Sequence, residues 1–410
     1  MSWVDTRLKY LCVDSGQYGL NVAADNYVAE GMRLIRTSDI TTDGSLRPDE
    51  EGVFVDIPVE PRHQLHHGDI LLSRSGTLGR SFMVPAAAQG QTFAGFLIRF
   101  RPRPGIVPRF LYYATQSKQF QGVIHSEAVS STIQNFNAER YANISLRVPD
   151  SEEQQRIADF LDAQTALIGR LSSRMKAQDD LLALRRRSVM ARAWMADAPS
   201  VRLGYFLLLV TSGPRGWGEY VSDDGKLFFR SANLRRDSIN PNLASVVRVT
   251  PPENAVAESV RSTVYVDDVL VGITGANTGW VTHADERVAG ASVSQHVCLL
   301  RPSSAAINGT WLAYLLSSPK VQDELLGSQY GGTKTQLSLP DLRDLRVPIP
   351  SLEDQSVLCR SIDSELAQIE GERVLRKRQI ALLAERRQAL ITAAVTGQFD
   401  VTAARRITTA

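Results

Sequence analysis

The chain has 410 residues, of which 43% are hydrophobic and 22% are charged, the usual balance of a soluble globular protein. This length is too great for one ordinary domain and predicts two or three. The 46 basic and 44 acidic side chains leave a formal net charge of only +2. The overall charge therefore identifies no class of partner, although basic residues can still gather on one face.

The three cysteines, Cys12, Cys298 and Cys359, lie far apart in the chain. They form no CxxC pair, which excludes a closed disulfide set or a four-ligand zinc site and indicates a reducing interior. The start, MSWVDTRLKYL, lacks the apolar stretch of a secretory signal, and no run approaches the ~18 apolar residues of a membrane span. We expect a soluble cytoplasmic protein without membrane contact.

The first segment, residues 1–149, mixes strand and helix patterns. Short β-type runs occupy 32–40, 69–73 and 96–102, and residues 110–124 have helical spacing. Between them lie polar loops such as SRSGTLGR and SSTIQNFN, whose compact donors and acceptors suit phosphates and base edges. Any one of these loops is equally explained as a plain hairpin connection.

A long helix is predicted next, over residues 151–196, with Ser151 and Gln154 as a capping box. Its apolar residues follow the alternating three-four spacing of a narrow seam. These are Ile157, Leu161, Ile168, Leu171, Met175, Leu182 and Val189. The consecutive arginines 185–187 are expected on a solvated helix face or at a partner contact.

The second segment, residues 200–350, repeats the first pattern. Strand-type runs occupy 226–234, 268–274 and 297–302, and residues 310–326 have helical spacing. Its polar loops are TSGPRGWG, TGANTG and QYGGTKTQ.

A second long helix follows over residues 352–397, with Ser351 and Asp354 at its start and Gly397 at its end. Its seam is formed by Ile362, Leu366, Ile369, Ile380, Leu383 and Leu390. Each long helix runs roughly 45 residues, or about 65 Å. The two most simply pair as a coiled coil; the alternative is that each packs on its own domain as a surface helix.

The chain contains an internal repeat in which one unit occurs twice. Residues 154–193 align with 355–394 without a gap at an offset of 201. Identical pairs include Gln154 with Gln355 and Asp162 with Asp363. The segments upstream match more faintly but in the same order, as in GDILLSRSGTLGR and DDVLVGITGANTG.

These features resemble the specificity subunit of type I restriction–modification systems. The resemblance rests on VPIPSLEDQ (347–355), the weaker VPDSEEQQRIADFLD (148–162), GDILLSRSGTLGR (68–80) and the ending LLAERRQALITAAVTGQFDV (382–401), and it covers essentially the whole chain. It implies an α+β fold with two tandem pseudo-symmetric target-recognition domains, joined by two long helices that form an antiparallel coiled coil. The expected boundaries are 1–149, 150–199, 200–350 and 351–410.

The resemblance also implies function and partners. Each domain would read one part of a split, non-palindromic site in double-stranded DNA. The helices would bind two methyltransferase subunits, which carry S-adenosylmethionine, and a nuclease or translocase subunit can join them. This chain itself would bind no cofactor. The first unit has VPDS and ARAWMADAP where the family has a VPxP segment and a TAAVTGQ-like ending, so its partner contacts are less well defined.

Candidate site residues follow from this. Arginine and lysine would hold phosphates or guanine edges, and asparagine and glutamine suit adenine. The expected DNA contacts are Arg36, Ser38, Arg74, Ser75, Thr77, Arg80, Gln134, Asn135, Arg215, Trp217, Arg230, Asn233, Asn277, Lys334, Thr335 and Gln336. The expected partner contacts are Ile168, Leu171, Met175, Leu182, Ile369, Leu383 and Leu390.

No catalytic motif stands out. The chain has no GxGxxG-type cofactor loop followed by an NPPY-like tetrapeptide, and GGTK at 331–334 lacks the spacing of a phosphate loop. His63, His66 and His67 have no carboxylate or cysteine framework and are expected to be surface residues rather than metal ligands. We therefore expect a non-catalytic subunit. The alternatives are a specificity module of another restriction or phage-defence system, and a coiled-coil scaffold without a DNA role.

Overall fold

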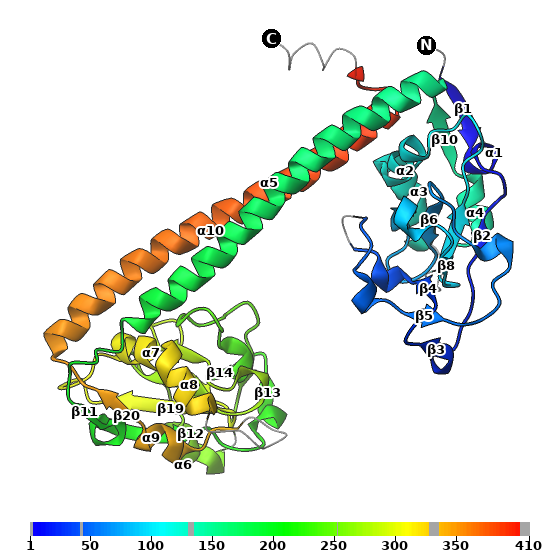
Figure 1. Ribbon diagram of the computed structural model, residues 1–410. Coiled ribbons are helices and arrows are strands. Elements are labelled where there is room, and N and C mark those ends of the chain that lie inside the picture. The colour runs from blue at the N-terminus through cyan, green and yellow to red at the C-terminus, as the bar shows by residue number, and fades with distance from the viewer. Residues whose placement is uncertain (1–2, 42–43, 130–134, 252, 328–335, 402–410) are drawn as a thin grey trace, which may run out of the picture. The chain divides into compact units, whose positions relative to one another are not determined.

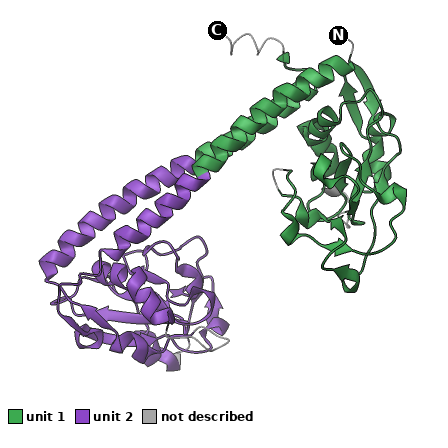
Figure 2. Cartoon of the chain, in the orientation of Figure 1, with its two compact units in different colours: residues 1–175, 377–410 green, residues 176–376 purple. Residues whose placement is uncertain are grey.

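The structure is a computed structural model that describes residues 3–41, 44–129, 135–251, 253–327 and 336–401. The chain divides into two compact units (Figure 2). Unit 1 comprises Met1–Met175 and Lys377–Ala410, and unit 2 comprises Lys176–Arg376. Each unit therefore contains one globular domain and a part of each long helix. The expected domain boundaries stay a prediction, because this division runs through the helices.

The globular domain of unit 1 contains two four-stranded sheets and a two-stranded ladder (Figure 1). Its strands are β1 (Val4–Arg7), β2 (Gln17–Tyr18), β3 (Tyr27–Val28), β4 (Met32–Ile35), β5 (Phe54–Val55), β6 (Ile70–Ser73), β7 (Ser81–Met83), β8 (Thr92–Phe93), β9 (Leu97–Phe100) and β10 (Ser145–Val148). One sheet has the order β2-β9-β6-β7 and is antiparallel. The other has the order β3-β5-β4-β8, with β4 and β8 parallel. The ladder pairs β1 with β10, which joins the start of the domain to its end.

The globular domain of unit 2 has the same topology. Its strands are β11 (Ser200–Arg202), β12 (Leu207–Ser212), β13 (Val221–Ser222), β14 (Lys226–Phe229), β15 (Arg248–Val249), β16 (Val269–Gly272), β17 (Val281–His283), β18 (Ser292–Val293), β19 (Val297–Pro302) and β20 (Arg346–Pro348). The sheets are β12-β19-β16-β17 and β13-β15-β14-β18, and β11 pairs with β20. The parallel pair recurs at β14 and β18. The α+β duplication expected from the sequence is confirmed.

Each of the two stretches with predicted helical spacing, residues 110–124 and 310–326, forms two helices in the structure. In unit 1 these are α2 (Pro108–Gln116) and α3 (Lys118–Val129). Ser117 separates them, because its hydroxyl donates to the carbonyl of Ala114 and accepts from the backbone N–H of Phe120. In unit 2 they are α7 (Gly309–Ser317) and α8 (Pro319–Gly327), where a proline begins the second helix. The shorter helices are α1 (Leu8–Leu11), α4 (Ala138–Asn143), α6 (Val256–Arg261) and α9 (Leu339–Asp344).

The long helices are α5 (Ser151–Ala191) and α10 (Leu352–Val395). The predicted capping box at the start of α5 is wrong. Asp150 caps this helix, since its carboxylate accepts from the backbone N–H of Glu153 at 2.9 Å. In α10 the predicted cap is confirmed, with the hydroxyl of Ser351 accepting from the N–H of Asp354 at 3.1 Å.

Gln154 and Gln355 have the same structural role in the two units. The side-chain oxygen of Gln154 accepts from the N–H of Val107 at 2.9 Å, and its amide nitrogen donates to the carbonyl of Pro149. Gln355 makes the matching bonds to Asn308 and Pro350. Both glutamines are buried, so each ties a long helix to its own globular domain.

Within each unit the two long helices pack together in antiparallel directions. In unit 1, Ile157 and Leu161 near the start of α5 share a core with Ile391 and Val395 near the end of α10. In unit 2, Asp179 accepts two hydrogen bonds from Arg373, at 3.1 and 3.3 Å. Farther along, Arg192 donates to Ser361 at 2.6 Å. The partner numbers fall along α10 as they rise along α5 and the residue that follows it, which is the antiparallel arrangement implied by the family resemblance.

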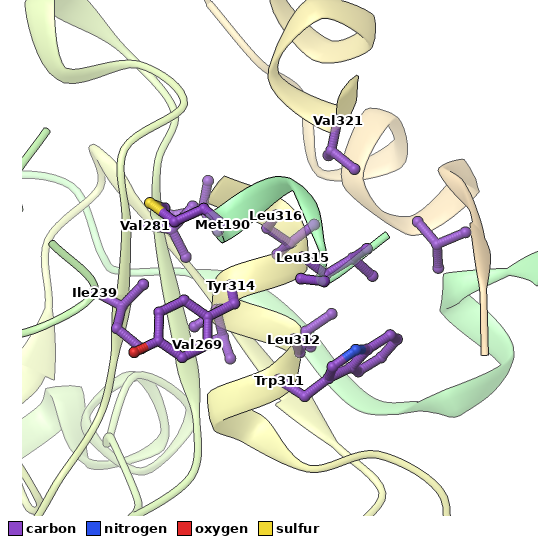
Figure 3. Close-up of a cluster of buried hydrophobic side chains, with 14 of the residues drawn as sticks. Met190, Ile239, Val269, Val281, Trp311, Leu312, Tyr314, Leu315, Leu316 and Val321 are labelled. Atoms are coloured by element: carbon purple, nitrogen blue, oxygen red, sulfur yellow. The ribbon is translucent and has the colours of Figure 1, made fainter. Parts of the chain in front are cut away.

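A separate hydrophobic core holds each globular domain to its helices. In unit 2, Met190 of α5 packs beside Val281 of β17 and Leu316 of α7, as Figure 3 shows. The same core includes Ile362 of α10. Each domain is thus packed against both long helices of its unit, and not against one alone.

A matched ion pair is buried in each globular domain. Arg101 donates to both oxygens of Asp69, at 2.7 and 2.9 Å, and Arg301 does so to Asp268, at 2.8 and 2.7 Å. Both carboxylates are 1% exposed, and each also accepts a hydrogen bond from the backbone N–H three residues earlier. Because the bond geometry is bidentate, the charge of each buried carboxylate is compensated.

Candidate nucleic-acid interface

The polar loops of unit 1 meet around a surface cavity of about 740 Å³. Its walls are supplied by the segment between β2 and β3, the loops after β4 and β6, and the turn before β9. Five expected contact residues line it: Arg36, Ser38, Ser75, Thr77 and Arg80. The structure therefore brings together side chains that are more than forty positions apart in the chain.

Two of the arginines at this cavity have structural partners. Arg36 donates to both oxygens of Asp39, and this hydrogen bonding raises the pKa of the guanidinium. Arg80 donates to the carbonyl of Ile40 at 2.8 Å. These hydrogen bonds fix the positions of both guanidinium groups, so the N–H donors that they present at the cavity wall have a defined arrangement.

Arg74 lies beside the cavity and contacts a distant loop. Its Nε donates to the side-chain oxygen of Asn135 at 3.2 Å, and its guanidinium lies 4.9 Å from the centre of the Tyr18 ring. Asn135 is exposed. Gln134, its neighbour in the chain, lies outside the described residues.

Phe96 is a candidate contact that the sequence pattern missed. The run that contains it was assigned to a strand, but β9 begins only at Leu97, and Phe96 forms the turn before it. Its side chain is 62% exposed and lines the cavity. An exposed aromatic ring among polar loops is suited to stacking on a base or wedging between base pairs. His296 occupies the matching turn in unit 2, where its carbonyl accepts from the N–H of Ile273 as that of Phe96 accepts from Arg74.

Two expected contacts in unit 2 are parts of the core. Trp217 is 2% exposed and packs with Phe228 and Val249, so its ring presents no surface to a ligand. Asn233 is 1% exposed, and its amide bonds to the backbone of Arg230, Asn242 and Ser245. Both side-chain types are suited to DNA contacts, but here they are buried and stabilise the loops that contain them.

The other expected residues of unit 2 lie nearer the surface. Arg215 and Gln336 are exposed, and Arg230 is half-buried. Asn277 is half-buried and donates from its amide to the carbonyl of Ser231 at 2.8 Å. Lys334 and Thr335 lie outside the described residues.

The histidine cluster is not a uniform surface patch. His63 is 9% exposed, which corrects the expectation for this residue, and burial lowers the pKa of its imidazole. His66 and His67 are exposed. Within the described part of the chain, no group of three histidine, cysteine or acidic side chains is placed to hold a metal ion.

The expected partner contacts on the long helices divide by burial. Ile168, Leu182 and Ile369 are buried at 6%, 7% and 0% exposure, so they offer no open surface to a partner, and Leu182 and Ile369 belong to the core of unit 2. Met175, Leu383 and Leu390 are half-buried, and Leu171 is 37% exposed. Several other apolar side chains on these helices are more exposed. Among them are Leu167, Leu181 and Leu184 on α5, and Val374, Leu375 and Leu382 on α10.

None of the helices in the described ranges combines the length and the apolar character needed to cross a membrane. The three cysteines are free and buried.

The duplicated α+β domain, with polar loops on each copy and long helices joining the copies, defines a protein with two similar recognition domains. Comparison with known families is in agreement. The model of the type I restriction modification DNA specificity domain matches the chain twice, over residues 60–177 and 261–378. The chain belongs to this family. The two matches lie one repeat apart, so the internal repeat and the family domain are the same unit.

Curated relatives carry names of the same kind. The chain is 23% identical over 289 residues to the type I restriction enzyme EcoBI specificity subunit of Escherichia coli, covering 63% of this chain and 59% of that protein. It is 22% identical over 298 residues to the StySPI specificity subunit of Salmonella potsdam, covering 67% and 62%. The aligned region thus spans about three-fifths of the length of these relatives.

Solved structures share the fold. A chain from a solved type I R-M system superposes with a TM-score of 0.77 at 18% identity, covering 97% of this chain and 98% of that chain. The HsdS subunit from Thermoanaerobacter tengcongensis superposes with a TM-score of 0.55 at 18% identity, covering 97% of both chains. The fold inferred from the resemblance is confirmed.

Proposed function

We propose that this chain is the DNA-specificity subunit of a type I restriction–modification enzyme and reads a split, non-palindromic site. One observation carries the proposal: the same domain occurs twice, with different side chains on corresponding loops. The loop after β6 presents Ser75 and Thr77, whereas the loop after β16 presents Ala276 and Asn277. Because the scaffold is shared and the loop chemistry differs, the two domains would read two different half-sites.

The two half-sites would lie about one DNA turn apart, roughly 34 Å, as is usual for paired recognition elements related by a pseudo-two-fold axis. The long helices would set that spacing. Phosphate and base contacts would come from the loops around the cavity of unit 1 and the corresponding loops of unit 2.

The proposal assigns the chemistry to partner subunits. Two methyltransferase subunits would bind along α5 and α10, where the exposed leucine and valine side chains offer apolar contact area. They would carry S-adenosylmethionine and flip the target adenine out of the duplex. A nuclease or translocase subunit would complete the restriction complex. This chain would bind no cofactor, and the three free cysteines favour a cytoplasmic location.

The test is to co-express the chain with the methyltransferase encoded beside it and to map methylated adenines across a genome. A split motif is expected. Exchange of residues 1–149 for the corresponding domain of another family member should change one half of the motif and leave the other half intact. The unmodified chain in the same host is the control.

Absence of methylation and of DNA binding by the assembled complex would overturn the proposal. A change in both halves of the motif after the single exchange would contradict independent reading by the two domains.

A further inference from the structure

A second and larger cavity lies in unit 2. Its volume is about 1140 Å³. Residues from α5, α8, α10 and the loop between β16 and β17 line it. Four of them are Arg186, Arg187, Arg236 and Arg373, and we name it the arginine cavity after these residues. Two aspartates, Asp237 and Asp323, also line it, so cationic side chains are in excess.

Arg186 is the unusual member of this group. The arginines around it in the sequence were expected to be solvated, but Arg186 is only 8% exposed. Among the residues that the structure describes, it makes neither a hydrogen bond nor an ion pair, and only longer-range interactions reach it, from Asp237 and Glu370 among others. Burial lowers the pKa of its guanidinium. A buried cation without a hydrogen-bonded acidic partner is costly, and a bound anion would lower that cost.

The other arginines of the cavity differ in how far they are already neutralised. Arg373 donates to both oxygens of Asp179, at 3.1 and 3.3 Å. Arg187 and Arg236 are exposed at the cavity edge. A ligand at Arg186 would therefore share the cavity with two further guanidinium groups that carry no ion pair among the described residues. Guanidinium forks match the oxygens of phosphate better than a point charge does.

The four-arginine lining of this cavity is particular to unit 2. In the repeat, Arg187 corresponds to Gln388, whose amide donates to the carbonyl of Gln116 at 2.7 Å. Arg373 corresponds to Ser172 at the same offset. Unit 1 therefore lacks two of the four arginines, and the cationic lining is not a general consequence of the fold.

We propose that the arginine cavity binds a phosphate group, with Arg186 as its innermost ligand. The phosphate comes either from the DNA backbone or from a free phosphate compound, and the chemistry of recognition is the same. Binding of a phosphate of the DNA backbone rests on the proposed function, whereas binding of a free phosphate compound does not.

The first arm of the test uses inorganic phosphate. Thermal unfolding of the full chain is measured in potassium phosphate and in potassium chloride at equal ionic strength. At about tenfold above its Kd, phosphate should raise the Tm by about 3 °C. Arg186→Gln should abolish this shift. Arg185→Gln removes a charge from the adjacent, exposed position outside the cavity and should retain it.

Fluorescence provides a readout that does not depend on unfolding, since Trp280 lines the cavity. Phosphate should change the emission of the parent and of Arg185→Gln, but not of Arg186→Gln. If Arg186→Gln does not fold, Arg187→Gln and Arg236→Gln change exposed side chains and should each weaken the phosphate response at least several-fold.

The second arm identifies the source. If the DNA backbone occupies the cavity, Arg186→Gln should lower the slope of log K against log salt by about 0.9 relative to Arg185→Gln, because one phosphate contact is lost. If a free phosphate compound occupies it, Arg186→Gln and Arg185→Gln should have equal salt slopes. Phosphate should then still raise the Tm of Arg185→Gln and not that of Arg186→Gln. Failure of the parent chain and its assembled complex to bind DNA at all would count against the proposed function and not against the site.

An equal phosphate response in the parent and in Arg186→Gln, with equal salt slopes, would overturn the inference. Stabilisation by potassium glutamate as large as that by phosphate would also overturn it, since that result would indicate the carboxylate of an acidic protein partner.

Discussion

The hydroxyl of Tyr113 in α2 donates a hydrogen bond of 2.7 Å to the carboxylate of Asp162 in α5. In unit 2, Tyr314 of α7 donates to Asp363 of α10 in the same way. Both tyrosines are 4% exposed, and burial raises the pKa of both phenols, so they remain protonated donors at neutral pH. Gln154 and Gln355, at the starts of the two long helices, and these tyrosine–aspartate contacts attach each globular domain to the long helix that follows it in the chain.

Removal of the Tyr113 hydroxyl should weaken this attachment. Tyr113→Phe keeps the ring and deletes the donor to a charged acceptor, so we expect a loss of about 1.5 kcal/mol in the free energy of unfolding, measured in denaturant. Tyr10→Phe removes a hydroxyl from a ring that is 59% exposed and should change stability by less than about 0.5 kcal/mol. Equal effects of the two substitutions would contradict the role assigned to this bond.

The buried ion pairs should be far more sensitive than exposed pairs. Arg301→Ala leaves the carboxylate of Asp268, which is 1% exposed, without its bidentate partner. We expect a loss of about 3 kcal/mol. Arg287→Ala breaks the pair with Asp285, in which the arginine is 57% exposed, and should cost less than about 1 kcal/mol. Denaturant unfolding of both variants measures the difference, and similar losses would show that burial of Asp268 does not matter.

Phe96 should contribute to DNA affinity and not to stability. Because its ring is 62% exposed beside the cavity, Phe96→Ala should leave the unfolding free energy within about 0.5 kcal/mol of the parent. We expect binding of the assembled complex to its specific DNA to weaken about tenfold, from the loss of one stacking or wedging contact.

The matched control for Phe96 is Tyr10→Ala, which removes an exposed ring from another part of the same domain. Fluorescence anisotropy with labelled duplexes gives both affinities. An unchanged affinity for Phe96→Ala, or an equal loss for Tyr10→Ala, would exclude Phe96 from the interface.

The length of the helices should determine the spacing of the half-sites. One heptad inserted into α5 after Met175 and one into α10 after Arg376 preserves the seam and adds about 10 Å to the pair. The spacer of the methylated motif should lengthen by about three base pairs, at 3.4 Å each. Genome-wide mapping of methylated adenines measures it. Insertion into one helix only should disrupt the pairing, and an unchanged spacer in the double insertion would rule out the helices as the ruler.

The sequence by itself determined the duplication, the α+β class and the two long helices, and the family resemblance implied that these helices pair in antiparallel directions. An offset of 201 residues runs through Gln154 and Gln355 to Asp162 and Asp363, and these residues prove to make the same contacts in both units. Hydrophobic periodicity and repeat spacing are local or collinear properties, so they can be seen before the chain is folded.

Only the tertiary structure decided which polar and apolar residues face outward. Trp217 and Asn233 have side chains suited to DNA but are buried, while Phe96 was counted as a strand residue and is exposed. Ile168, Leu182 and Ile369 were expected at a partner surface but are buried within the chain. Arg186 lies within a run of three arginines and is nevertheless the one that is buried. Burial depends on what other parts of the chain pack against a residue, and residue type and spacing along the sequence do not contain that information.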